Sequence, residues 1–204
     1  MIVIADYGLG NLGSLKNMFK AINQKVSIES CPKQISLAKK LVLPGVGNFD
    51  KAMDLINKTD GLRDIIIDKA SNQKVPVLGI CLGMQILLDS SEEGEMKGLG
   101  LIEGESIRFP AKKNLKVPHM GWNSVVSSGY NAHFCSDLPL DSRYYFAHSY
   151  YARVKNAKHT MMKTNYALEF DSAICRGNIF GVQFHPEKSH RFGMNILEKF
   201  SSLN

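Results

Sequence analysis

The chain has 204 residues and a formal net charge of +6, and it is 44% hydrophobic and 22% charged. These values are ordinary for a globular protein, and the length predicts a single domain over residues 1–204. No run approaches the roughly 18 apolar residues that a membrane span needs, and the lysines form no basic stripe with interleaved aromatic residues. We therefore expect neither membrane insertion nor nucleic-acid binding.

The first half of the chain alternates between strand-like and helix-like patterns. Buried strands are predicted at residues 2–5, 26–28, 40–43 and 75–80. Helices are predicted at residues 11–22, 49–56, 62–70 and 83–88. This alternation predicts an α/β fold with a mostly parallel, doubly wound central sheet flanked by helices.

The pattern changes from about Gly98 to shorter strands that are joined by turns. Strands are predicted at residues 101–102, 106–109, 123–126, 144–151, 160–163, 172–175 and 179–184, and a final helix at 192–200. Residues 90–94 and 110–114 are predicted polar loops. We expect this half to form a small antiparallel extension of the sheet.

A single cysteine stands between two glycines where the fourth strand should end, in the segment Gly79-Ile-Cys81-Leu-Gly83. This segment has the form of a nucleophile elbow with cysteine in place of serine. The N-terminus of the following helix favours a thiolate, but a free thiol titrates near about pH 8.5 and needs a base. Taken alone, a cysteine in an apolar strand is more often an inert core residue.

The segment Phe184-His185-Pro-Glu187 supplies a candidate base at the end of another apolar run. Pro186 favours an extended conformation at the residue before it, so that Glu187 can turn back to hold the imidazole. A lone histidine at a strand end carries little weight. Together with Cys81, however, it predicts a Cys–His–Glu triad at the carboxyl edge of the sheet, where ligands bind in open α/β folds.

The segment Pro44-Gly-Val46-Gly47 should end the third strand at the same edge of the sheet. Glycines there allow a backbone N–H group to face a ligand. We expect the N–H groups of Val46 or Gly47, together with that of Leu82, to form an oxyanion hole. The motif alone fits an ordinary strand-to-helix turn equally well.

Four cysteines lack any C-x-x-C spacing, so neither a zinc site nor a redox pair is predicted. They are Cys31, Cys81, Cys135 and Cys175. No basic leader precedes the first strand, so we expect no secretory signal and reduced thiols in a cytoplasmic protein.

These motifs resemble those of the class I (triad) glutamine amidotransferases. The Pro-Gly-Val-Gly segment and Pro-His-Met-Gly-Trp-Asn123 are most similar to those of the glutaminase subunits of imidazole glycerol phosphate synthase. The chain departs from that family at Gly13, where arginine is usual, and at Asn48, where a small residue is usual. Resembling stretches cover residues 6–12, 43–49, 78–85, 116–123, 145–150 and 181–189.

The resemblance implies a flavodoxin-like fold and hydrolysis of L-glutamine to glutamate and ammonia through a thioester on Cys81, without cofactor or metal. It also implies a heterodimer with a (β/α)₈-barrel synthase, which uses the ammonia to make imidazole glycerol phosphate and AICAR in histidine biosynthesis. The implied glutamine contacts are Gln85, Glu93, Ser149 and Tyr150. The implied partner contacts are Asn11, Trp122 and Lys188.

Three alternatives remain open. Residues 178–193 also resemble a paralogous branch that supplies ammonia for amino sugars of surface polysaccharides. Another Cys–His hydrolase of the same fold and a catalytically silent subunit are the other two. On the residues alone, Gln85 is a polar helix residue, Glu93 a surface charge and Trp122 a core residue.

Overall fold

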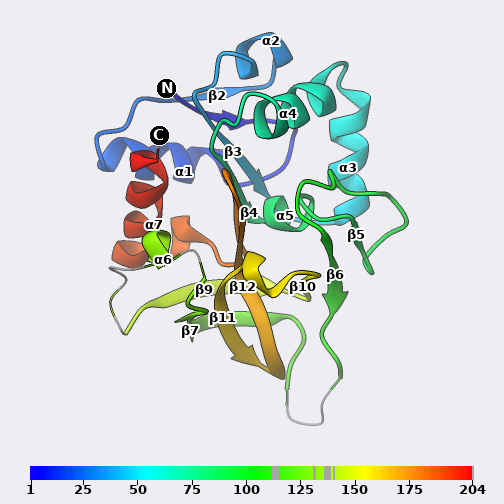
Figure 1. Ribbon diagram of the computed structural model, residues 1–204, viewed down its shortest axis with the longest axis vertical. Coiled ribbons are helices and arrows are strands. Elements are labelled where there is room, and N and C mark those ends of the chain that lie inside the picture. Colours follow the sequence, from blue (N-terminus) through cyan, green and yellow to red (C-terminus); the bar gives the residue numbers. More distant parts are fainter. Residues whose placement is uncertain (112–114, 131, 136–138, 140, 204) are drawn as a thin grey trace.

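One sheet of eleven strands runs through the part of the chain that the structure, a computed structural model, describes: residues 1–111, 115–130, 132–135, 139 and 141–203. Its parallel half has the order β2-β1-β3-β4-β13 (Figure 1). These strands are β1 (Ile2–Ala5), β2 (Val26–Glu29), β3 (Lys40–Gly45), β4 (Val77–Cys81) and β13 (Ile179–Val182). The predicted parallel α/β core is confirmed.

Helices cover both faces of this half, as a doubly wound sheet requires. Figure 1 shows α1 and α7 on one side of β3 and β4, and α3 and α5 on the other. None of the helices in the described ranges is long and apolar enough to cross a bilayer. The helices are α1 (Leu12–Ala21), α2 (Pro32–Ile35), α3 (Phe49–Lys58), α4 (Leu62–Ser71), α5 (Leu82–Gln85), α6 (Ala132–Cys135) and α7 (His190–Ser202).

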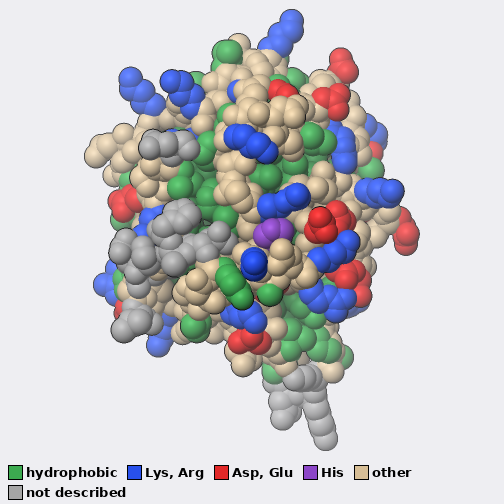
Figure 2. Space-filling view, viewed as in Figure 1, with side chains coloured by type: hydrophobic (Ala, Val, Ile, Leu, Met, Phe, Trp, Pro, Cys, Tyr) green, Lys and Arg blue, Asp and Glu red, His purple; other side chains and the backbone are tan. Residues whose placement is uncertain are grey.

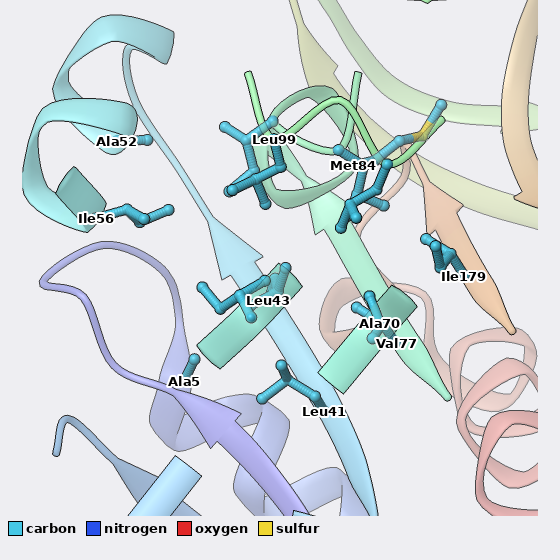
Figure 3. Close-up of a cluster of buried hydrophobic side chains, with 14 of the residues drawn as sticks. Ala5, Leu41, Leu43, Ala52, Ile56, Ala70, Val77, Met84, Leu99 and Ile179 are labelled. Carbon is cyan, nitrogen blue, oxygen red and sulfur yellow. The ribbon is translucent and has the colours of Figure 1, made fainter. Parts of the chain in front are cut away.

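Successive residues of each strand point to opposite faces, so the sheet divides the core into two clusters. Ile2 and Ile4 pack with α1 and α7, whereas Val3 and Ala5 pack with α3 and α4. Figure 3 shows the second cluster, in which side chains of α3 face those of β1 and β3. Burial on both faces explains why these strands read as continuous apolar runs in the sequence.

The second half of the chain continues the sheet with antiparallel strands and adds a separate two-stranded sheet. β12 pairs antiparallel with β13, β11 and β10, and β7 pairs with β9. The strands are β5 (Ser90–Ser91), β6 (Gly104–Arg108), β7 (His119–Ser124), β8 (Val126–Ser127), β9 (Arg143–His148), β10 (Tyr150–Val154), β11 (Thr160–Tyr166) and β12 (Leu168–Arg176). Two short 3₁₀ helices are η1 (Ala157–His159) and η2 (Pro186–Lys188).

Several predicted boundaries are wrong for identifiable reasons. The helix predicted at residues 83–88 ends at Gln85, because the carbonyls of Ile86 and Leu87 accept hydrogen bonds from the N–H groups of residues 99, 101 and 102. Residues 101 and 102 donate these bonds to Leu87 and do not form the predicted strand. The strand predicted at 144–151 divides at Ser149, since β9 pairs with β7 and β10 pairs with β6.

Smaller differences concern short elements. The helices α2 and α6 have too few residues for an amphipathic period and were not predicted. Ser90–Ser91, expected in a loop, pairs with β6. Residues 112–114 of the other predicted loop lie outside the described residues.

The charged surface is mixed. On the face in Figure 2, Lys and Arg side chains are scattered and interspersed with Asp and Glu rather than gathered in a stripe. On this face the positive side chains are therefore dispersed, as expected for a solvated lysine-rich surface.

Two helical glycines provide a matched test of how tightly the segment after β13 is packed. A Cβ atom added at Gly193 in α7 would lie 1.9 Å from the Pro186 carbonyl oxygen, whereas one at Gly13 in α1 would meet nothing within 4 Å. We predict that Gly193→Ala lowers the free energy of unfolding by about 1–3 kcal/mol through overpacking. Gly13→Ala should raise it by up to about 1 kcal/mol. Urea denaturation of both variants checks this, and equal changes in the two would contradict the packing.

Candidate active site

Cys81 occupies a strained turn where β4 meets α5. Its backbone has φ 55° and ψ −110°, a conformation that residues other than glycine rarely adopt. The glycines on either side are required. A Cβ atom added at Gly79 would lie 2.4 Å from the Gly83 backbone oxygen, and one added at Gly83 would lie 1.8 Å from the Leu43 backbone oxygen. Such strain persists where the surrounding structure imposes it, and it is common at functional sites.

His185 and Glu187 form a buried pair beside the cysteine. His185 Nδ1 lies 2.8 Å from Glu187 Oε1, and the two side chains are only 3% and 2% exposed. The backbone N–H of His185 donates to the Tyr145 oxygen, and the His185 oxygen accepts from the Ser189 hydroxyl. Because Nδ1 faces the carboxylate, Nε2 is left to face Cys81.

The surroundings of His185 favour its protonated form. Burial acts to lower the pKa of the imidazole, but hydrogen bonds to Cys81 and Glu187, and the charges of both groups, outweigh it and raise the pKa above the usual value. An imidazolium between a carboxylate and a sulfur atom is the arrangement that holds a cysteine as thiolate.

One cavity of about 370 Å³ brings most of the predicted site residues together, but not Asn11 and Trp122. Cys81 and His185 line it, while Glu187 lies behind His185. Its wall also includes Val46, Gly47 and Leu82 of the predicted oxyanion hole, Lys188, and all four predicted glutamine contacts, Gln85, Glu93, Ser149 and Tyr150.

The loop of the predicted oxyanion hole is fixed at its ends and open in the middle. The Tyr7 hydroxyl donates to the Pro44 oxygen, and the Asn48 side chain accepts from the N–H of Lys51 and caps α3. Between them Val46 is exposed and Gly47 has φ 110° with no atom near its missing side chain. Capping gives a physical reason for the asparagine at position 48.

Two of the predicted glutamine contacts also hold the scaffold. Glu93 Oε2 accepts from the N–H of Phe49 at the start of α3, at 2.8 Å. Gln85 Nε2 donates to the Tyr150 oxygen at 3.0 Å and to Gln183 Oε1 at 3.1 Å. Reading Glu93 as a solvated surface charge is therefore wrong.

The predicted partner contacts lie on the surface. Trp122 is 47% exposed, which contradicts the expectation of a core residue, and its ring stacks on His190 with centroids 5.6 Å apart. Lys188 Nζ lies 5.4 Å above the ring of Tyr145, which also contacts Trp122 edge-on. Asn11 is exposed at the start of α1 and does not border the cavity.

Sequence reasoning missed Gln183, whose Nε2 lies 3.7 Å from Cys81 Sγ. A usable signal was present. Gln183 precedes His185 by two residues at the end of a strand, and residues two apart in an extended chain share a face.

The other thiols lie in different surroundings. Burial raises the pKa of Cys135 to about 11 and that of Cys175 to about 12, whereas Cys31 is exposed; all four cysteines are free. Within the described ranges no group of three or more His, Cys, Asp or Glu side chains is arranged to hold a metal ion.

Known proteins give full-length matches. A subunit HisH 2 of imidazole glycerol phosphate synthase from Methanococcus maripaludis is 50% identical over 98% of both chains. Subunit HisH from Bdellovibrio bacteriovorus is 44% identical over the whole of both chains, and a HisH 2 from Pseudomonas aeruginosa is likewise 44% identical over the whole of both chains.

Solved structures agree on the fold. A structure described as a glutamine amidotransferase superposes with a TM-score of 0.74 at 14% identity, over 98% of both chains. The structure of PurLQS from Thermotoga maritima gives 0.73 at 15% identity, over 98% of this chain and 96% of that chain.

The family model for class-I glutamine amidotransferases matches residues 3–202, nearly the whole chain. The cysteine turn, the buried His185–Glu187 pair and the cavity of this chain all lie within the matched region. The chain belongs to the class-I glutamine amidotransferase family.

Proposed function

We propose that this chain is the glutaminase subunit of an imidazole glycerol phosphate synthase, and that it hydrolyses L-glutamine with the triad Cys81, His185 and Glu187. The observation that carries this proposal is that the strained Cys81 and His185 line one cavity, and that His185 is held by the buried Glu187. The end-to-end similarity to HisH subunits supports the assignment to histidine biosynthesis.

In the first half of the reaction, Cys81 Sγ attacks the side-chain carbonyl carbon of glutamine. His185 holds the thiol proton and gives it to the leaving nitrogen, so that a C–S bond forms, the C–N bond breaks and ammonia departs. Glu187 orients the ring through Nδ1 and stabilises its positive charge. The product on the enzyme is a γ-glutamyl thioester.

In the second half, water replaces ammonia beside His185. The imidazole takes a proton from the water as its oxygen attacks the thioester carbon, and the C–S bond breaks to release glutamate and restore the thiolate. Both halves pass through a tetrahedral oxyanion. N–H groups of Val46 or Gly47 and of Leu82, which border the cavity, are the proposed donors to that oxygen.

The remaining predicted residues take roles that match their positions. Gln85, Glu93, Ser149 and Tyr150 line the cavity and are proposed to recognise the amino and carboxylate ends of glutamine. Asn11, Trp122 and Lys188 are proposed to contact the synthase subunit. This chemistry requires no metal or cofactor, because proton transfer and thioester formation use side chains alone.

Ammonia that escapes into water is protonated and loses its nucleophilicity. A closed contact with the subunit that consumes it is therefore advantageous, and we propose a (β/α)₈-barrel partner in a cytoplasmic heterodimer. We further propose that residues 1–204 act as one domain, because a single sheet joins both halves. The relatives compared above are named as synthase subunits, so the polysaccharide branch is not favoured.

The first test identifies the nucleophile. Diazo-oxo-norleucine, a glutamine-like electrophile, should attach once per chain, at Cys81, because only this thiol lies beside a base in the cavity. Cys81→Ala should abolish both labelling and glutamate release, while Cys135→Ala serves as the buried control. Peptide mass spectrometry locates the label, and its appearance at Cys31, Cys135 or Cys175 would refute the assignment.

The second test concerns the pH dependence of the triad. Glu187 contributes to the raised pKa of His185, so Glu187→Gln should lower that pKa. The alkaline limb of kcat/KM, where the imidazolium is lost, should then move to lower pH. His185→Asn should lose about 10²–10⁴ in rate and Glu187→Gln less. Steady-state glutamate release across pH decides this, and a limb that stays in place or moves to higher pH contradicts the roles.

The third test addresses the partner. The open Val46–Gly47 turn predicts that the lone chain is a weak glutaminase and that binding of the synthase completes the oxyanion hole. Gaining one such donor should raise kcat by about 10²–10³. Lys188→Ala should weaken partner affinity or stimulation, while Lys58→Ala, at the exposed end of α3, should not. Kinetics with and without the synthase subunit measure this, and full activity of the lone chain would exclude gating by a partner.

A further inference from the structure

A single backbone oxygen, that of Tyr150, determines the direction of a buried hydrogen-bond network. It accepts from Gln85 Nε2 at 3.0 Å and from His148 Nδ1 at 2.7 Å. A carbonyl oxygen can only accept, so both of these nitrogens must carry the hydrogen. The orientation of every side chain beyond them follows from this.

The branch through Gln85 leads inward to the cysteine. Gln85 presents its NH₂ group, so Gln183 must turn its carbonyl oxygen toward it, at 3.1 Å. The NH₂ group of Gln183 then faces Cys81 Sγ, at 3.7 Å. With this polarity Gln183 donates a hydrogen bond to the sulfur, and it has no freedom to present its oxygen instead.

The branch through His148 leads outward to the two-stranded sheet. With its hydrogen on Nδ1, His148 accepts at Nε2 from His119 Nδ1, at 2.9 Å, and His119 Nε2 accepts from Asn123 Nδ2, at 3.2 Å. This pattern requires one hydrogen per ring. Burial lowers the pKa of His119 to about 4 and, acting first among several causes, that of His148 to about 3, so both rings are neutral near pH 7.

The network is closed to water where it reaches the cysteine. Gln183 is 0% exposed and Gln85 is 5% exposed. A buried donor finds little competition from solvent, and a hydrogen bond to a charged acceptor there is stronger than one between neutral groups. Within the described residues, Sγ is the acceptor that the structure gives to the Gln183 NH₂ group.

We propose that Gln183 is a further catalytic residue, which donates a hydrogen bond to the Cys81 sulfur and is held in that orientation by Gln85 and the Tyr150 oxygen. The Cys81 sulfur then accepts hydrogen bonds from both His185 and Gln183. The bond stabilises the thiolate before attack, and it stabilises the same sulfur as the leaving group when the thioester breaks. The role in glutamine hydrolysis rests on the proposed function, whereas the effect on the thiol does not.

The test measures alkylation of Cys81 by iodoacetamide from about pH 5 to about pH 10, without glutamine, by quantifying the modified peptide. The midpoint of this pH profile is the pH at which alkylation reaches half of its maximal rate. Gln183→Leu should move the midpoint to higher pH by about one to two units, the effect of losing a hydrogen bond to a charged group. Gln183→Glu keeps the size of the side chain and covers the case in which the leucine variant does not fold. Its carboxylate should also move the midpoint upward, because it repels a thiolate.

Ser172→Ala is the matched control. Ser172 is fully buried on the neighbouring strand β12, and its backbone oxygen accepts from the backbone N–H of Gln183. Its side-chain hydroxyl has no hydrogen-bond partner among the described residues. Its removal should leave the midpoint unchanged. Midpoints that do not move in either Gln183 variant, both folded by circular dichroism, would overturn the proposal.

A double-mutant cycle tests the orientation. Gln85→Leu frees the Gln183 amide to rotate, so it should shift the midpoint in the same direction, and it should add nothing to Gln183→Leu. Fully additive shifts would show that Gln85 does not act through Gln183. Glutamate release by the wild-type chain together with its synthase subunit separates the two hypotheses. An inactive complex with a Gln183-dependent thiol refutes the proposed function alone, and an active complex with a Gln183-independent thiol refutes this inference alone.

Discussion

The close contact between the start of α5 and the end of β3 is the constraint on which the site depends. Gly83 approaches the Leu43 oxygen so closely that any side chain at that position would collide with it. Cys81, two residues earlier, adopts a positive φ where the chain makes this approach. Cys81 lines the same cavity as the loop after β3 and the segment after β13.

The second half of the chain completes what the parallel sheet begins. The parallel strands supply Cys81 and lead to Gln183 and His185. The carbonyl that accepts from the His185 N–H group comes from β9, and the carbonyl that accepts from the Gln85 side chain comes from β10. The division of one predicted strand at Ser149 has a function here. It lets β9 support the His–Glu segment from the two-stranded sheet while β10 remains in the main sheet and presents the Tyr150 oxygen to the cavity.

The sequence predicts those parts of the site that local patterns encode. The elbow around Cys81 and the His185-Pro-Glu187 segment are short motifs, and the alternation of strands and helices places both at one sheet edge. The end of α5 is not encoded locally, because it depends on backbone pairing with residues 99–102. The hydrogen-bond network was missed for the same reason: Gln85 and Gln183 are 98 positions apart, and only the fold brings them together.

The open face of the two-stranded sheet explains why the prediction of a buried Trp122 is wrong. A lone tryptophan is expected in the core because of its large apolar surface. Here β7 belongs to a two-stranded sheet with one face open, and the ring covers His190 rather than entering either core cluster. Met120 on the same strand is also exposed and lines the cavity, so it leaves apolar surface there.

The Trp122–His190 stack gives the protein a built-in optical reporter. Trp122 is the only tryptophan in the chain, so the indole fluorescence originates at one place in the fold. That place is beside Tyr145, over whose ring lies Lys188, a residue of the cavity wall. Its emission therefore senses the polarity and hydration of the surface around Tyr145 and His190, and a molecule that covers this surface can be followed without attaching a dye.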